Sequence, residues 1–265
     1  MRKQNILITG SQGFIGKNLI RELNKQDAVN IFEASRKNGL NLSEKNWTKN
    51  LPEHDIDVVI HLAQSNNYRN FPSKADDIFK INIASTFELL EWCRKRKIKK
   101  FFLASSGNVY GDHSNLLKET SRTNPSSFYG VSKLAAEKIS ESYQEFFQII
   151  ILRIFTVFGQ GQKNMLIPNI INKIQNDEKI TLAKNKGILF NPIFIQDFIK
   201  ILIGLISKEG LERSSIINIA GNNKVDLKKV SILLADHIGK RPIFRITEDK
   251  ESYFLADITK IKSIF

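Results

Sequence analysis

Three glycines follow the first apolar run of the chain and restrict its fold more than any other feature of the sequence. NILIT (5–9) reads as a buried strand, and TGSQGFIG places Gly10, Gly13 and Gly16 directly after it, where a helix is expected from about Phe14. Gly10 permits a tight turn, Gly13 lets the backbone approach a pyrophosphate, and Gly16 allows close packing of helix on strand. The G-x-x-G-x-x-G spacing at this position predicts a dinucleotide site.

The later apolar runs alternate with segments of helical periodicity. Continuous apolar runs separated by helices are typical of a parallel sheet that is covered on both faces. We expect further strands at VNIFEA (29–34), DVVIHLA (57–63), FFLASS (101–106) and QIIILRIF (148–155), and helices at 73–97 and 127–147. The predicted fold class is α/β, with a Rossmann-type doubly wound parallel sheet.

The pattern changes after Phe158, where GQGQKN reads as a loop and is followed by short strands and further helices. We expect an NAD(P)-binding Rossmann domain over residues 1–158, to which strand segments after 158 are able to return. Residues 159–265 are expected to form a smaller, mainly substrate-binding part.

Cysteine, histidine and hydropathy patterns exclude several classes of protein. The single cysteine, Cys93, cannot form an intrachain disulfide and fits a reducing cytoplasm. The N-terminal MRKQNILITG lacks the apolar core of a signal peptide, and the longest apolar stretch, FIKILIGLI, is too short to span a bilayer. The four histidines lack ligand spacing. We therefore predict a cytoplasmic protein with no membrane partner and no metal.

The net charge of +13 raises the alternative of a nucleic-acid partner. The densest basic run, RKRKIKK (94–100), closes a predicted helix, and cations at a helix C-terminus are favoured by the helix dipole. The run contains no interleaved aromatic residues. We therefore predict no nucleic-acid partner.

A tyrosine and a lysine lie four positions apart in SSFYGVSKLAAEK (126–138), at the start of a predicted helix. Residues at this interval share one helical face, so the Lys133 ammonium is able to act on the Tyr129 phenol or on a ligand between them. Y-x-x-x-K alone favours an ordinary amphipathic helix with two incidental polar groups, and its meaning depends on the other motifs.

Taken together, the motifs resemble those of the extended short-chain dehydrogenase/reductase family, in its nucleotide-sugar epimerase/dehydratase branch. Their order and spacing agree through most of the chain. The matching segments are TGSQGFIG, HLAQ (61–64), KINIAST (80–86), SSGNVYGD (105–112), YGVSK (129–133), LRIFTVFGQGQ (152–162), IFIQDF (193–198), INIAG (217–221) and LADITKIK (255–262).

The resemblance implies three catalytic residues. Tyr129 would be the proton donor and acceptor, Lys133 would hold the nicotinamide ribose, and Ser106 would orient the reacting substrate oxygen. An unperturbed phenol titrates near pKa ~10, so we expect Lys133 and the positive nicotinamide ring to stabilise the phenolate and lower the pKa of Tyr129.

The same resemblance implies two sets of binding residues. Cofactor-binding residues are expected at Gly10, Gln12, Gly13, Phe14, Ile15, Gly16, Ser35, Arg36, Leu62, Ala63, Asn82, Ser105, Tyr129 and Lys133. Substrate-binding residues are expected at Ser106, Gly107, Asn108, Tyr129 and Thr156.

Departures from the family pattern restrict the reaction. Sugar 4,6-dehydratases of this family carry an acidic pair directly after the catalytic Ser or Thr, where this chain has Gly107 and Asn108. Dehydration is therefore disfavoured, and reduction of a 4-keto-sugar nucleotide is the favoured activity, with NAD-dependent 4-epimerisation of a nucleotide sugar as the alternative. Thr156 replaces a frequent substrate-contacting Asn, and Phe190 replaces a frequent diphosphate-binding Arg.

The end of the second predicted strand bears on the choice between NAD and NADP. NAD enzymes place an acidic residue there for the ribose hydroxyls. In IFEASRK, Glu33 precedes that position by one residue, and Ala34 occupies it. Ser35 and Arg36 suit a 2′-phosphate, because arginine presents a fixed fork of donors. We predict NADP in preference to NAD.

Two further expectations concern function class and assembly. The alternative to an enzyme is a non-catalytic protein that binds a dinucleotide and acts as a sensor or scaffold. Such relatives commonly lose the tyrosine or the lysine, both of which this chain retains. The resemblance also implies a homodimer that pairs the helices near 73–97 and 127–147.

Overall fold

The computed structural model describes residues 2–112 and 115–265 and divides the chain into two compact units. The first unit contains the chain up to Gly111, together with Thr123–Arg153 and Ile199–Ile217. The second contains Asp112–Arg122, Ile154–Phe198 and Asn218–Phe265. The sequence division at residue 158 stays a prediction.

A six-stranded sheet forms the centre of the first unit, in the order β10-β5-β4-β3-β1-β2. β1 pairs in parallel with β2 and β3, and β3 pairs in parallel with β4. The strands are β1 (Gln4–Thr9), β2 (Val29–Ala34), β3 (Val58–His61), β4 (Lys100–Ser106), β5 (Gln148–Ile154) and β10 (Ser214–Ile219). The strand order reverses at β1, and ligands of such sheets bind beyond the carboxyl ends at this switch point. The predicted α/β class and Rossmann-type sheet are confirmed.

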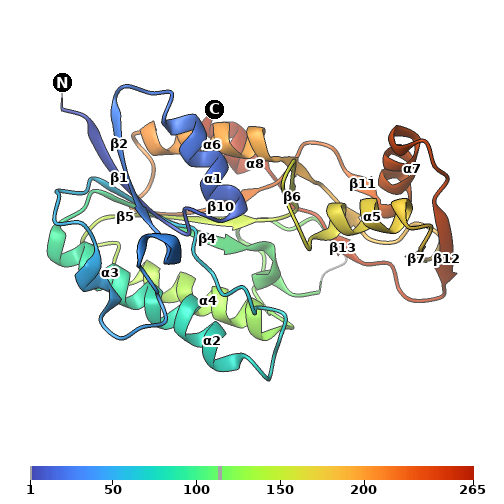
Figure 1. Ribbon diagram of the computed structural model, residues 1–265, viewed down its shortest axis with the longest axis horizontal. Coiled ribbons are helices and arrows are strands. Elements are labelled where there is room, and N and C mark those ends of the chain that lie inside the picture. The colour runs from blue at the N-terminus through green and yellow to red at the C-terminus, as the bar shows by residue number, and fades with distance from the viewer. Residues whose placement is uncertain (1, 113–114) are drawn as a thin grey trace. The chain divides into compact units, whose positions relative to one another are not determined.

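Helices cover both faces of this sheet, with α2, α3 and α4 on one side and α1 and α6 on the other (Figure 1). They are α1 (Phe14–Leu23), α2 (Ala75–Phe79), α3 (Ser85–Arg96), α4 (Phe128–Glu141) and α6 (Ile195–Ser207), of which α6 begins in the second unit. Short 3-10 helices lie at η1 (Arg36–Asn38), η2 (Trp47–Asn50) and η4 (Gly107–Tyr110). The helix expected at 73–97 is interrupted by a π-helical turn, η3 (Lys80–Ala84).

The core of the first unit follows from strand alternation. Leu7, Val59 and Phe101 occupy neighbouring strands and point toward the helical layer of α3 and α4. The strand residues of this cluster meet Leu89, Leu90 and Cys93 of α3 and Ala136 of α4. This packing fixes α4 against the carboxyl half of the sheet.

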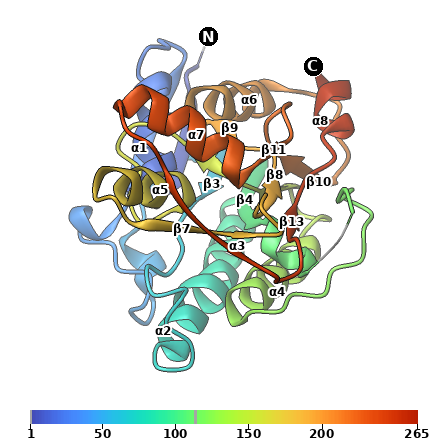
Figure 2. The same ribbon diagram turned by 90° about the vertical axis from the view of Figure 1, so that its right-hand side faces the viewer.

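The second unit has a separate core between α5 and α7, which pack against each other (Figure 2). Its sheets are small, with the orders β11-β8-β13, β12-β7 and β6-β9. Its elements are β6 (Val157–Phe158), α5 (Leu166–Gln175), β7 (Lys179–Ala183), β8 (Leu189–Phe190), β9 (Ile193–Phe194), β11 (Val225–Asp226), α7 (Leu227–Ile238), β12 (Ile243–Thr247), β13 (Tyr253–Phe254) and α8 (Thr259–Ile264).

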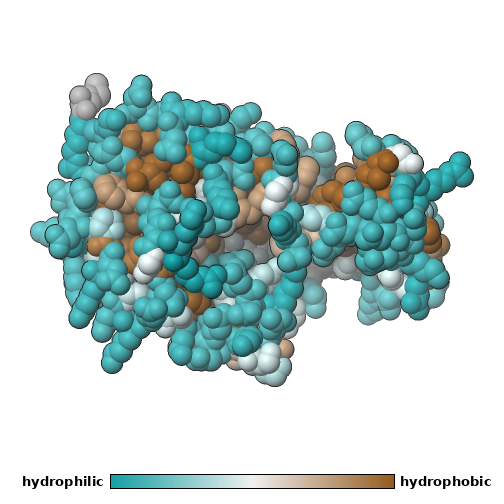
Figure 3. Space-filling model, in the orientation of Figure 1, coloured by the Kyte–Doolittle hydropathy of each residue, from teal (hydrophilic) through white to brown (hydrophobic). Residues whose placement is uncertain are grey.

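Hydrophilic side chains cover most of the first unit's face in Figure 3, and apolar side chains gather there in separate patches. Each helix of residues 2–112 and 115–265 is too short or too polar for a transmembrane span.

We expect Gly16→Ala to destabilise the protein, because the added Cβ would lie 2.4 Å from the Gly10 carbonyl oxygen and 2.7 Å from that of Ser11. Backbone atoms cannot move aside as a flexible side chain can, and such overpacking costs about 1–3 kcal/mol. Urea unfolding measures the change. The exposed neighbour Lys17 supplies the control, since Lys17→Ala is expected to stay within about 0.5 kcal/mol of the wild type. Equal midpoints for Gly16→Ala and wild type would contradict the packing.

Candidate active site

The glycine loop after β1 packs directly on the end of β3. Gly10 has φ +69°, and a Cβ there would lie 2.7 Å from the Ala63 nitrogen. The Gly10 N–H donates to the Ala34 carbonyl at 3.0 Å, which joins the loop to the end of β2 as well. The loop, Leu62 and Ala63, all predicted cofactor residues, therefore lie together at the carboxyl edge.

The N-terminus of α1 presents backbone N–H groups to this edge. Its N-cap is Gly13, and within the described part of the chain no side chain caps the helix. Unsatisfied N–H groups and the helix dipole favour an anion here. The buried hydroxyls of Ser11 and Ser35 also lack hydrogen-bond partners among residues 2–112 and 115–265. Buried donors of this kind fit a polar ligand, so the residues present suit a dinucleotide.

An acidic, a hydroxyl and a basic side chain follow one another closely at the end of β2: Glu33, Ser35 and Arg36. The Gln12 amide donates to Glu33 Oε2 at 2.9 Å, so the carboxylate lies against the glycine loop. Ser35 is buried, and Arg36 is exposed on η1. Glu33 was not among the predicted cofactor residues, because it precedes the expected position of the acid by one residue, but its contact with the loop makes it a candidate.

His61, which belongs to the HLAQ segment but was not a predicted site residue, joins β1, β3 and α3. The Thr9 hydroxyl lies 2.6 Å from Nδ1, and Nε2 lies 3.0 Å from the Thr86 hydroxyl. Because Thr86 donates its own proton to the Asn82 carbonyl, its oxygen accepts from Nε2–H, and Nδ1 accepts from Thr9. Burial, and next the charge of Lys133, lower the pKa of His61 to about 3. The ring is therefore neutral near pH ~7.

Asn82, a predicted cofactor residue, lies in the π-helical turn η3. Its amide nitrogen donates to the Ser132 hydroxyl at 2.9 Å, and its oxygen accepts from the Ser65 N–H at 2.9 Å. Ser132 in turn donates to the Tyr129 carbonyl at 2.8 Å. The turn thus joins the loop after β3 to the first turn of α4.

Ser106, Tyr129 and Lys133, the predicted catalytic residues, all belong to the first unit. Ser106 ends β4, and its hydroxyl accepts from the Asn108 backbone and side-chain amides, each at 3.2 Å. The Tyr129 hydroxyl donates to Gln64 Oε1 at 3.0 Å. The Lys133 Nζ lies 5.9 Å from the centre of the Tyr129 ring and donates to the Ala104 carbonyl at 2.8 Å.

Burial controls the protonation of Tyr129 and Lys133. It raises the pKa of the Tyr129 phenol, and a side-chain hydrogen bond with Ser106 acts in the opposite direction. It lowers the pKa of Lys133 to about 8, and the Glu137 carboxylate opposes this change. Our expectation that Lys133 and the positive nicotinamide ring together lower the pKa of Tyr129 applies to the protein with its dinucleotide bound and stays a prediction.

The loop after β3 reaches the candidate catalytic tyrosine. The rings of Tyr68 and Tyr129 have centroids 4.9 Å apart, and the Arg69 guanidinium lies 4.9 Å from the centre of the Tyr68 ring. Asp77 holds the loop by accepting from Ser65 and Asn67. The loop therefore borders the position where a substrate would meet the phenol.

The remaining substrate candidates occupy different places. Gly107 is buried, and Asn108 is exposed and bound to Ser106. Thr156 lies in the second unit, where its carbonyl accepts from the Ile193 N–H at 2.8 Å. Phe190, which replaces a frequent arginine, is fully buried in the second unit's core. Within the described ranges, no three His, Cys, Asp or Glu side chains form a metal-binding group.

Comparisons with known proteins agree with this geometry. The family model "NAD dependent epimerase/dehydratase family" matches residues 6–220. A Bacillus subtilis protein described as an uncharacterized UDP-glucose epimerase, YtcB, is 30% identical over 98% of this chain and 91% of its own length. An Escherichia coli dTDP-4-dehydro-6-deoxyglucose reductase is 30% identical over 91% of this chain and 84% of its own length.

A solved structure with the same fold carries a dinucleotide. The UDP-glucuronic acid 4-epimerase of Bacillus cereus, solved in complex with NAD, has a TM-score of 0.86 and 26% identity, and the match covers 98% of this chain and 90% of that chain. With the family model spanning most of the sequence, this chain belongs to the NAD dependent epimerase/dehydratase family of extended short-chain dehydrogenase/reductase enzymes.

Proposed function

We propose that the protein is a nucleotide-sugar 4-epimerase, which oxidises and re-reduces one carbon of its substrate. The observation that carries the proposal is the arrangement of Ser106, Tyr129 and Lys133 in the unit that contains the glycine loop, with neutral Gly107 and Asn108 where an elimination would need acids. The names of the Bacillus relatives support epimerisation. Reduction of a 4-keto-sugar nucleotide, which the sequence favoured, is the second candidate, supported by the Escherichia coli relative and by Ser35 and Arg36.

The side chains have distinct tasks in this reaction. Tyr129 would take the proton of the sugar 4-hydroxyl and return it, and Ser106 would orient that oxygen. Lys133 would bind the nicotinamide ribose and stabilise the phenolate. The bound nicotinamide dinucleotide supplies the hydride acceptor and donor. Gln64 Oε1, which accepts from the phenol, marks a position that a substrate hydroxyl would take.

Incubation with NAD and UDP-glucose, UDP-galactose or UDP-glucuronate tests the proposal. We expect proton NMR to show the 4-epimer without net formation of reduced nicotinamide. Tyr129→Phe removes the acid/base hydroxyl and should lower turnover about 10²–10⁴-fold, with NAD affinity changed at most a few-fold. Tyr143→Phe, which removes a hydroxyl bound to Glu91, is the matched control. Full activity of Tyr129→Phe would refute the mechanism, and stoichiometric consumption of NADPH with a keto-sugar would favour the reductase.

Lys133→Met is expected to weaken NAD binding and slow turnover together, because the ammonium would serve both the ribose and the phenol. Isothermal titration calorimetry and the turnover assay measure the two effects. Lys138→Met changes an exposed lysine of the same helix and should leave both near wild type. A loss of thermal stability alone in Lys133→Met would instead favour a structural role.

The cofactor's 2′ position distinguishes the two candidate activities. An epimerase retains its dinucleotide, and the Glu33 carboxylate against the glycine loop would repel a 2′-phosphate, so the epimerase proposal pairs with NAD. The reductase pairs with NADP(H), held by Ser35 and Arg36. We expect NADH to bind at least as tightly as NADPH and Arg36→Ala to change little. An NADPH preference of about ten- to a hundred-fold that Arg36→Ala abolishes would support the reductase and the NADP prediction.

We also propose a homodimer that pairs α2–α3 and α4 of two copies. Phe79, Phe87 and Val131 on these helices are about half exposed, and pairing of the helices between two copies would remove them from water. Light scattering at micromolar concentration should give the mass of a dimer, and Phe87→Glu with Val131→Glu should give a monomer. Ile246→Glu, at an exposed position of β12, is the control. A monomeric wild type would refute the proposal.

A further inference from the structure

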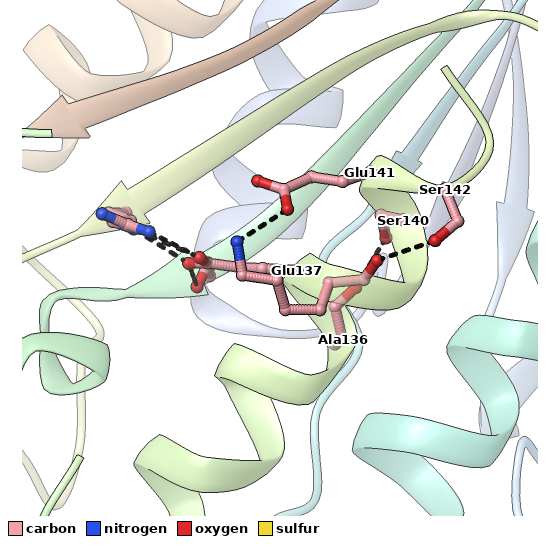
Figure 4. A network of polar contacts seen from close by, with 8 residues as sticks. Ala136, Glu137, Ser140, Glu141 and Ser142 are labelled. Atoms are coloured by element: carbon pink, nitrogen blue, oxygen red, sulfur yellow. Dashed lines mark hydrogen bonds and ion pairs between the residues drawn. The ribbon is translucent and has the colours of Figure 1, made fainter. Parts of the chain in front are cut away.

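Glu137 is a fully buried carboxylate to which the proposed reaction assigns no task. Its side chain is 0% exposed and that of its partner Arg153 is 3% exposed. Arg153 Nη2 lies 2.7 Å from Oε2, and Nε lies 3.1 Å from Oε1. The Ser105 hydroxyl also donates to Oε1. Figure 4 shows Glu137 on α4, with dashed lines from its carboxylate to a guanidinium group.

The position of Glu137 connects it to all three catalytic candidates. It follows Lys133 by four residues and Tyr129 by eight, so the three share one face of α4. Ser105 immediately precedes Ser106 and follows Ala104, whose carbonyl accepts from Lys133. Two successive residues of β4 are thus attached to two successive turns of α4.

Stability alone does not explain such a pair. Removing two charges from water is costly, and apolar replacements of a buried pair are often neutral or stabilising. The next turn of the same helix carries Lys138–Glu141, a surface pair at 2.8 Å that avoids this cost. The buried pair lies instead where β4, β5 and α4 meet, next to the candidate site.

We infer that Glu137 is a positioning residue, whose carboxylate anchors the end of β4 to α4 and supplies the negative charge that the buried Lys133 ammonium requires. Arg153 is ion-paired with this carboxylate, and the charge of Glu137 acts on the buried Lys133 ammonium one turn earlier on α4. The inference rests on the proposed function only for its turnover measurement, because the binding of NAD provides a separate one.

The groups around Lys133 give this role a measurable consequence. Glu137 raises the pKa of Lys133 against burial, and the pKa that results is about 8. Tyr129 lies on the same helix, and His61 on β3 responds to the Lys133 charge. Burial by the surrounding residues lowers the pKa of Lys133, and among the described residues Glu137 is the one charged group that acts on it. Without the Glu137 charge, the ammonium would lose its proton at a lower pH.

The test is the pH dependence of NAD affinity, measured by calorimetric titration of wild type and Glu137→Gln. Affinity that depends on a charged Lys133 is present below its pKa and is lost as the pH rises through about 8. In Glu137→Gln the midpoint of this loss should move to lower pH by roughly one pH unit. The two proteins should agree within a few-fold at pH values below both midpoints.

Two variants separate charge from shape. Glu137→Asp keeps the charge and should keep the wild-type midpoint, even if the shorter side chain weakens the anchor. Glu141→Gln neutralises the exposed carboxylate one turn further along α4 and should change nothing. An unchanged midpoint in Glu137→Gln would overturn the inference.

Ser105 provides a test that leaves the ion pair intact if Glu137→Gln does not fold. Ser105→Ala removes the hydroxyl donor to Glu137 and should lower kcat about ten-fold, with the substrate KM little changed. The loss of this buried hydrogen bond should also lower the melting temperature. Ser105→Thr retains a hydroxyl and should restore kcat. Wild-type kcat in Ser105→Ala would overturn the anchoring role. Wild-type protein that binds NAD but converts no nucleotide sugar would refute the proposed function instead, and the pH midpoints would still decide the role of Glu137.

Discussion

The burial of Lys133 against the Ala104 carbonyl is the contact on which the rest of the candidate site depends. A buried ammonium is costly unless it is hydrogen-bonded and close to a negative charge. The Ala104 oxygen provides the hydrogen bond, and Glu137 provides the charge. Any sliding of α4 along β4 would break the hydrogen bond and leave a charge in apolar surroundings. The position of Tyr129, one turn before Lys133, follows from this constraint.

The same burial changes three titratable groups in ways that suit proton transfer. It raises the pKa of the Tyr129 phenol, and it lowers the pKa values of Lys133 and His61 to about 8 and about 3. Near neutral pH the phenol is therefore protonated, the imidazole is neutral and most of the lysine is charged. The neutral His61 ring connects β1 to α3 by its two hydrogen bonds. Lys133 is the nearby cation that is able to stabilise a phenolate of Tyr129.

Neutral residues next to Ser106 are the reason why we propose no dehydration. Elimination of water needs an acid and a base beside the oxidised carbon. Gly107 is buried in η4, and the Asn108 side chain donates to Ser106. Transfer of one proton and one hydride at a single carbon needs neither acid, which is why both candidate activities are redox reactions at one centre.

The local sequence pattern was sufficient to predict the sheet, the glycine loop and the Tyr129–Lys133 pair. The period of apolar residues and the spacing of motifs specify which residues share a strand face or a helix face. It was insufficient for contacts between distant segments. The hydrogen bond from Tyr129 to Gln64 joins residues 65 positions apart, and the Glu137–Arg153 pair needs α4 to pack on β5. The π-helical turn at Asn82 was likewise hidden in an ordinary helical pattern.

The sequence by itself determined the fold class, the position of the dinucleotide loop and the identity of the candidate catalytic residues. The tertiary structure alone decided the protonation of Tyr129, Lys133 and His61 and the partners of Glu137. The reason is physical: a pKa depends on how far a group is removed from water and on which charges surround it. Both are fixed only when helices and strands that lie far apart in the chain have packed together.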